Sequence, residues 1–97
     1  MKLPATQVKA RVAKLPGWKL SKGALVRQLT FKSFPEAIAF TTRLAFDAQE
    51  ADHHPDLLIS YKRVTVTWST HSEGGVTEKD FTGVRQTDTV AKLFGAS

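Results

Sequence analysis

The chain has 97 residues, a net charge of +5 and no cysteine, and 41% of its residues are hydrophobic. This length suits one small domain with a single core, and the lack of cysteine excludes disulfides and the commonest structural zinc sites. No apolar run is long enough for a membrane span, and the segment from Met1 to Leu20 has no continuous apolar block of a signal peptide, so we expect a soluble, cytoplasmic protein.

Positive charge is concentrated in the first third of the chain. Eight lysine and arginine residues precede the first acidic residue, Glu36. A basic face raises non-specific affinity for nucleic acid, but on a small domain such a face is more often simply solvated. Nucleic-acid binding is therefore a disfavoured alternative, and no membrane partner is expected.

The first residues predict a helix followed by a β-hairpin. Apolar residues recur at i, i+4 and i+7 between positions 4 and 15, which predicts a short amphipathic helix ended by the Pro-Gly pair at 16–17. Strands are predicted at 18–20 and 24–32. The three residues between them, 21–23, include a glycine of the kind that a tight turn needs.

A second helix is predicted from residue 33 to about residue 52. Ser33-Phe34-Pro35-Glu36 fits a capping box, in which the Ser33 hydroxyl accepts from the Glu36 amide and the Glu36 carboxylate accepts from the Ser33 amide. A helix that is apolar around much of its girth needs cover on two sides, so we expect self-association through this helix. Its apolar residues are Ala37, Ile38, Ala39, Phe40, Leu44, Ala45, Phe46 and Ala48.

The second half of the chain predicts two more strands and a last helix. Strands are predicted at 57–61 and 64–70, joined at Lys62-Arg63, and a Gly-Gly turn follows at 74–75. Thr77-Glu78-Lys79-Asp80 resembles a capping box, with Asp80 placed to accept from the Thr77 amide. The helix that starts there carries Phe81, Val84, Ala91 and Phe94.

The predicted order is helix, hairpin, helix, two strands, helix. Hairpins favour antiparallel pairing, so we expect residues 1–97 to form a single small α+β domain with three helices packed on one face of a four-stranded antiparallel sheet. Trp68 is in phase with Val64 and Val66, which predicts that its side chain lies in the core.

All three histidines fall in two short segments, Asp52-His53-His54-Pro55 and Ser69-Thr70-His71. Pro55 ends helical continuation, which places the histidine pair at a helix-to-strand corner. Histidine both gives and accepts a proton near neutrality, so the cluster indicates acid/base chemistry or a metal site.

Three readings of the histidines stay open on the residues alone. Acid/base catalysis is one. A metal site is weakened because adjacent histidines chelate one ion awkwardly and the helical i, i+4 pairing is missing. The histidines could also be ordinary surface residues. Asp52 could orient an imidazole, or it could be a surface acid at the end of a helix, which is the commoner case.

The order and spacing of these residues resemble a known signature. The run Asp52-His53-His54-Pro55, then Tyr61, then Ser69-Thr70-His71, a glycine-bearing turn and Asp80 is similar to the pterin-4a-carbinolamine dehydratase family. Gly17-Trp18 and the entry to the second helix at 31–34 are also similar, so the resemblance covers nearly the whole chain.

The resemblance implies a fold, an assembly and an activity. It implies a four-stranded antiparallel sheet with three helices, assembled as a dimer or tetramer. The implied reaction is dehydration of 4a-hydroxytetrahydropterin, such as 4a-hydroxytetrahydrobiopterin, to quinonoid dihydropterin and water, in tetrahydrobiopterin recycling. No metal and no organic cofactor is implied.

The resemblance also implies roles for individual residues. His53 and His71 are expected to transfer protons, His54 to hold the pterin and share in transfer, and Asp80 to orient His71. Backbone groups of Thr70, Ser72 and Glu73 are expected along the polar edge of the pterin. The substrate-binding set is then His53, His54, Pro55, Thr70, His71, Ser72 and Glu73.

The chain departs from the family pattern at one position, which bears on the rate of catalysis, and the resemblance separately implies a second function. Four residues before His53 the family usually has a charged residue, whereas this chain has Gln49, with Glu50 next to it. Members of the family are also dimerisation cofactors of a homeodomain transcription factor, which implies an alternative role as a transcriptional coactivator, an interaction module without catalysis. In that case the second helix, through Phe40 and Leu44, is expected to make the contacts.

Overall fold

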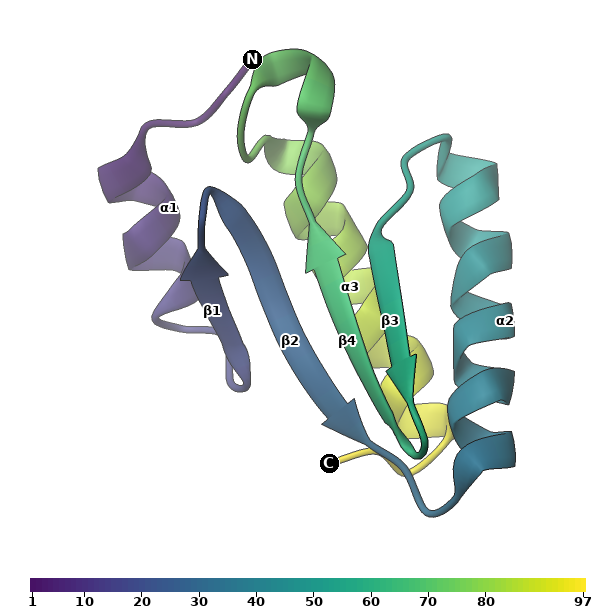
Figure 1. Ribbon diagram of the computed structural model, residues 1–97. Coiled ribbons are helices and arrows are strands. Elements are labelled where there is room, and N and C mark those ends of the chain that lie inside the picture. The colour runs from purple at the N-terminus through teal and green to yellow at the C-terminus, as the bar shows by residue number, and fades with distance from the viewer.

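The computed structural model describes residues 1–97 and has three helices on one face of a four-stranded antiparallel sheet (Figure 1). This confirms the predicted α+β class. The strand order is β1-β2-β4-β3. The elements are α1 (Ala5–Val12), β1 (Trp18–Ser21), β2 (Ala24–Thr30), α2 (Phe34–Ala51), β3 (Asp56–Ser60), β4 (Arg63–Trp68), the short 3₁₀ helix η1 (His71–Glu73) and α3 (Glu78–Leu93).

Both hairpins turn on two residues. Lys22 and Gly23 join β1 to β2 with φ of 50° and 75°, and Tyr61 and Lys62 join β3 to β4 with φ of 55° at Tyr61. Positive φ at the turn matches the right-handed twist of the paired strands. The predicted three-residue first connection was therefore one residue too long, and the second connection was placed one residue too late.

The observed ends of the helices agree only in part with the predicted ones. α2 begins after Ser33, but the predicted capping box there is wrong: the Ser33 hydroxyl donates to the Glu36 carboxylate and accepts from no helix amide. The capping box predicted at α3 is confirmed. The Thr77 side chain accepts from a backbone amide of the first turn, and the Asp80 carboxylate accepts from the Thr77 amide. α1 ends at Val12, earlier than predicted.

The core lies between the sheet and the three helices. Eighteen buried hydrophobic side chains form it, with Trp68, Phe40 and Leu44 among those with no exposed surface. The prediction for Trp68 is confirmed. Phe40 and Leu44 point into this core, so the expectation that they form the outer contact face of α2 is wrong.

α2 nevertheless carries a second apolar face that nothing in the chain covers. Phe46 is 71% exposed, Phe34 47% and Ile38 38%. These three residues recur at i, i+4 and i+12, which places them on one side of the helix. We call this set the outer α2 face.

The sheet register brings the two histidine segments to one end of the molecule. β3 and β4 are antiparallel neighbours with Asp56 opposite Thr67. His53 and His54 precede β3 and His71 follows β4, so both segments extend beyond this same end of the strand pair (Figure 1). No helix is both long and apolar enough to cross a bilayer.

Candidate active site

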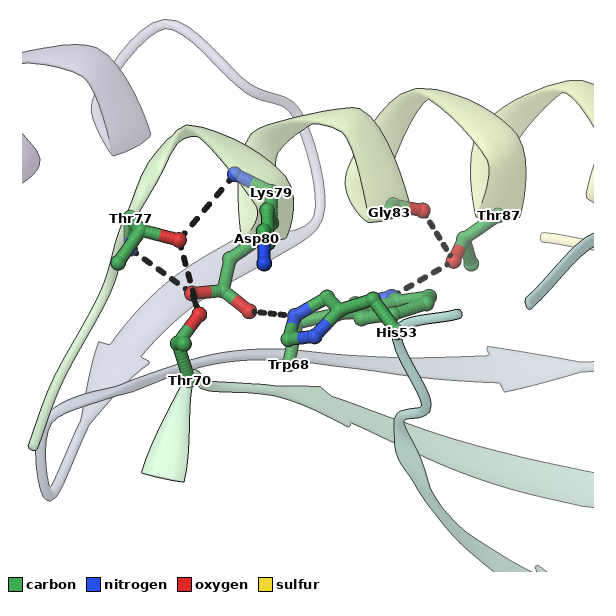
Figure 2. Close-up of polar contacts among 8 residues, drawn as sticks. All are labelled: His53, Trp68, Thr70, Thr77, Lys79, Asp80, Gly83 and Thr87. Carbon is green, nitrogen blue, oxygen red and sulfur yellow. Dashed lines mark hydrogen bonds and ion pairs between the residues drawn. The ribbon is translucent and has the colours of Figure 1, made fainter. Parts of the chain in front are cut away.

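His53 is held between a buried carboxylate and a buried ring. Its Nε2 lies 2.6 Å from Oδ1 of Asp80, whose side chain has no exposed surface, while 14% of the His53 side chain is exposed. The imidazole stacks on the Trp68 ring, with centroids 5.4 Å apart and planes 29° apart (Figure 2). Both neighbours restrict rotation of the imidazole.

Asp80 is fixed by the first turn of α3 and by Thr70, the residue that precedes η1. Its Oδ2 accepts from the Thr77 amide at 2.9 Å and from the Thr70 hydroxyl at 2.8 Å. The Thr70 and Thr77 hydroxyl oxygens are 2.8 Å apart, and the Lys79 amide donates to the Thr77 hydroxyl at 3.2 Å (Figure 2). Every polar atom of this buried cluster has a partner.

The direction of each hydrogen bond follows from the number of protons. Thr70 has one hydroxyl proton and donates it to Asp80, so the contact between the two hydroxyls requires Thr77 to donate to Thr70. An ionised Asp80 is an acceptor only, which assigns the proton of the 2.6 Å contact to His53 Nε2. His53 Nδ1 has no partner within the chain and is available to a ligand.

Trp68 is locked by α3 as well. Its Nε1 donates to the Thr87 hydroxyl at 3.0 Å, and that hydroxyl donates to the Gly83 carbonyl at 2.8 Å (Figure 2). A Cβ at Gly83 would lie 2.4 Å from the nearest Trp68 ring atom. Gly83 therefore permits the close approach of α3 to the ring that supports His53.

His54 is an exposed neighbour with its own partner. Its Nε2 lies 2.9 Å from the amide oxygen of Gln49, on the last turns of α2. Since an amide oxygen only accepts, this contact makes Nε2 the donor and leaves Nδ1 open. Gln49 is the position at which the chain departs from the family pattern. It contacts His54, whereas the partner of His53 is Asp80.

His71 begins η1 and is exposed, and its side chain has no hydrogen-bond partner in the chain. The backbone amides of His71 and Ser72 also have no acceptor in the chain. Thr70 differs: its amide donates to Gly75 at 2.9 Å and its carbonyl accepts from Glu73 at 3.0 Å. The expectation that the Thr70 backbone faces a ligand is therefore not supported, because those groups close the η1 loop.

One expectation about a carboxylate is corrected, and the favoured interpretation of another, Asp52 as a surface acid at a helix end, is confirmed. Asp80 contacts His53 and not His71, because the start of α3 packs against the corner before β3. Asp52 is an exposed residue in the left-handed conformation, φ 53°, at the end of α2, and it orients no imidazole. Of the three histidines, only His53 has a carboxylate partner.

The surface around the histidines is hollowed in two places. A cavity of about 110 Å³ lies beside His53. A larger one of about 400 Å³ is lined in part by Thr70, Ser72 and Glu73. His54 and His71 line none of the main cavities, and no three His, Asp or Glu side chains gather closely enough to hold a metal ion.

Comparison with known proteins agrees with this architecture. A family model described as pterin 4 alpha carbinolamine dehydratase matches residues 1–90. A candidate pterin-4-alpha-carbinolamine dehydratase of Sulfolobus acidocaldarius is 46% identical over 81 residues, which cover 84% of this chain and 89% of that protein. One of Thermosynechococcus vestitus is 48% identical over 79 residues, covering 81% and 83%.

Solved structures give the same result for the fold. A Brucella melitensis protein described as a transcriptional coactivator/pterin dehydratase aligns with a TM-score of 0.88 at 35% identity, over 94% of this chain and 99% of that one. A pterin dehydratase-like protein described as a RuBisCO assembly factor of the alpha-carboxysome shares the fold, with a TM-score of 0.62 at 21% identity over 76% of this chain and 86% of that one. The chain belongs to the pterin-4-alpha-carbinolamine dehydratase family.

Proposed function

We propose that the chain dehydrates 4a-hydroxytetrahydropterins to quinonoid dihydropterins, as a hydro-lyase in the recycling of tetrahydropterin such as tetrahydrobiopterin. The observation that carries the proposal is the His53 imidazole, with Nε2 fixed by a fully buried carboxylate and Nδ1 free. A neutral imidazole held in this tautomer is suited to accept a proton at Nδ1, and the carboxylate behind it stabilises the imidazolium that forms.

The reaction needs two proton transfers. The bond between C4a and the hydroxyl oxygen breaks as a double bond forms between C4a and N5. A base removes the proton on N5, and an acid protonates the departing hydroxyl so that it leaves as water. We assign the base to His53 and the acid to His71, which lies beyond the same end of the β3–β4 pair.

The remaining residues position the substrate in this proposal. His54, fixed through Gln49, borders the pterin next to Pro55, which shapes the corner. The unpartnered amides of His71 and Ser72, together with the Glu73 carbonyl, offer hydrogen bonds to the polar edge of the heterocycle, in place of the Thr70 backbone. No metal and no cofactor takes part.

The decisive experiment is a rate measurement. Quinonoid dihydropterin formation from a 4a-hydroxytetrahydropterin is followed above the spontaneous rate for the wild type, His53→Ala and His71→Ala. Each substitution is expected to lower kcat by about 10²–10⁴-fold, the usual contribution of a positioned acid or base. A chelator should leave the wild-type rate unchanged. Gln28→Ala, an exposed change on β2, is the control.

A second role rests on the outer α2 face. Three large apolar side chains exposed on one side of a helix are typical of a protein-interaction surface. We propose that a second copy of the chain covers this face, giving a dimer or tetramer. The alternative is a coactivator-like module without catalysis, which predicts that the histidine variants function as well as the wild type. The rate measurement therefore distinguishes the dehydratase from the coactivator-like module.

A further inference from the structure

The ring of Trp68 lies against the side chain proposed as the base. It has no exposed surface, and its centroid is 5.4 Å from that of the His53 imidazole, with 29° between the two planes. Figure 2 shows the two rings stacked, with the Asp80 carboxylate at the edge of the imidazole. The imidazole therefore has a carboxylate at its edge and an indole against its face.

Proton transfer changes the charge of His53. When the proton on N5 of the substrate moves to Nδ1, the proton on Nε2 stays with the contact to Asp80, and the neutral imidazole becomes an imidazolium. The face of an indole carries negative potential and attracts a cation within about 6 Å of the ring centroid, more strongly than the face of a phenyl ring. The contact between the rings is therefore stronger after the proton transfer than before it, which is the condition for an interaction to accelerate a reaction.

Burial makes this contact effective. Only 14% of the His53 side chain is exposed and none of the Trp68 ring is, so little water screens the attraction between them. A cation on an aromatic face contributes a factor of about 2–5 to an equilibrium at an exposed site and about 30 at a desolvated one. Lys79 lines the small cavity beside His53, so the imidazolium has a cation nearby as well as the Asp80 carboxylate. The indole face is thus a second source of stabilisation for the imidazolium.

The orientation of the indole is set by α3. Nε1 of Trp68 only donates, and its acceptor is the Thr87 hydroxyl, whose own proton goes to the Gly83 carbonyl. Thr87 has no exposed surface, so bulk water does not replace it as the acceptor. Gly83 leaves room for the ring, because any Cβ at that position would collide with it. A tryptophan at position 68 therefore needs both an acceptor at 87 and the absence of a side chain at 83.

We propose that Trp68 is a positioning residue that stabilises the imidazolium form of His53 through the face of its indole, and that Thr87 and Gly83 hold the indole in the orientation that this requires. The inference rests on the proposed function, because it needs His53 to become a cation during turnover. It gives a buried core side chain a part in the reaction, in addition to the part of Asp80.

Site-specific replacement of Trp68 by ring-fluorinated tryptophans tests the indole face at nearly constant shape. Fluorine withdraws electron density from the ring and is little larger than hydrogen, so the packing and the hydrogen bond to Thr87 are kept. With one, two and three fluorine atoms, kcat is expected to fall stepwise, by about tenfold in total, while KM stays the same. At a pH where half of His53 is doubly protonated in the wild type, ¹⁵N NMR should show a stepwise smaller fraction. The same series at Trp18, whose indole donates to Asp88, is the matched control and should change neither quantity.

Thr87→Val tests the hold on the indole, because it removes the acceptor at nearly constant volume. It is expected to lower kcat by about fivefold with KM unchanged, and to reduce the ring-current shift that the indole imposes on the ring protons of His53. Thr87→Ser keeps the hydroxyl and should restore both values. An unchanged kcat and ring-current shift in Thr87→Val would overturn the part assigned to Thr87.

The fluorinated proteins decide the proposal as a whole. A kcat within about twofold of the wild type throughout the Trp68 series would overturn it, and so would an equal fall in the Trp18 series. Failure of the proposed function would look different: the wild type would not dehydrate a 4a-hydroxytetrahydropterin above the spontaneous rate. In that case the ¹⁵N measurement, which needs no turnover, still shows whether Trp68 stabilises the imidazolium of His53.

Discussion

Asp80→Asn tests whether the buried carboxylate sets the proton on His53. Asparagine has nearly the same shape, but one of its two terminal atoms is an amide nitrogen that only donates. Thr70 and Thr77 both donate to the Oδ2 position, so the asparagine oxygen is expected there and its amide group faces His53. His53 Nε2 must then accept, which moves the imidazole proton to Nδ1.

The expected consequence is a loss of catalysis larger than the loss of stability. With Nδ1 protonated, His53 cannot take a proton from the substrate, so kcat should fall by about 10²–10⁴-fold. Replacing hydrogen bonds to a charged acceptor by bonds to a neutral one should cost about 1–3 kcal/mol of unfolding free energy. For a domain of this size that lowers Tm by about 4–8 °C per kcal/mol.

The assay pairs kinetics with spectroscopy on a folded variant. Imidazole ¹⁵N chemical shifts of His53 distinguish the two neutral tautomers, and thermal unfolding gives the stability. Thr70→Ser, which keeps the hydroxyl that donates to Asp80, is the control and should retain nearly the wild-type kcat. A folded Asp80→Asn protein that keeps kcat within about threefold of wild type would refute the assignment of the base.

Three other predictions follow from separate features. Gly83→Ala should lower the free energy of unfolding by about 1–3 kcal/mol in chemical denaturation, because the new Cβ would lie 2.4 Å from the Trp68 ring, even though alanine normally favours a helix. A stabilised variant would show that the Trp68 ring can move aside. Phe46→Glu should reduce the oligomer mass in light scattering, since this side chain is 71% exposed on the outer α2 face, and an unchanged mass would remove the proposed self-contact. The hydrogen bond from Arg11 lowers the pKa of Glu78 below its ordinary value of 4.5, so the stability that this pair adds is present above that value and is lost as the pH falls through the lowered pKa. Glu78→Gln should therefore make the denaturant midpoint less dependent on pH on the acid side, and an unaltered acid dependence would contradict this reading.

The elements could be predicted from the sequence because local rules determine them. The alternation of apolar residues defined β4, and Thr77 with Asp80 defined the start of α3. The capping box at Ser33 failed because the same residue types also allow a direct contact between the hydroxyl and the Glu36 carboxylate, and spacing does not separate the two.

The site was predictable only as a set of residues, because its pairings act through space. Nothing along the chain distinguishes His53 from His71 as the partner of Asp80; the packing of α3 against the corner before β3 decides it. The stacking of His53 on Trp68 was missed for the same reason. The aromatic ring at the end of an alternating strand, two residues before Thr70, was the available signal, and it was interpreted as core alone.

The carboxylate that begins α3 is also the one that holds the proposed base. If the first helical turn frays, Asp80 loses the Thr77 amide, and the imidazole is released with it. Local opening of a few residues, which costs much less free energy than global unfolding, would therefore release the proposed base from its carboxylate. Hydrogen exchange at the Thr77 amide then measures the fraction of molecules in which the hydrogen bond to Asp80 is open and the proposed base is released.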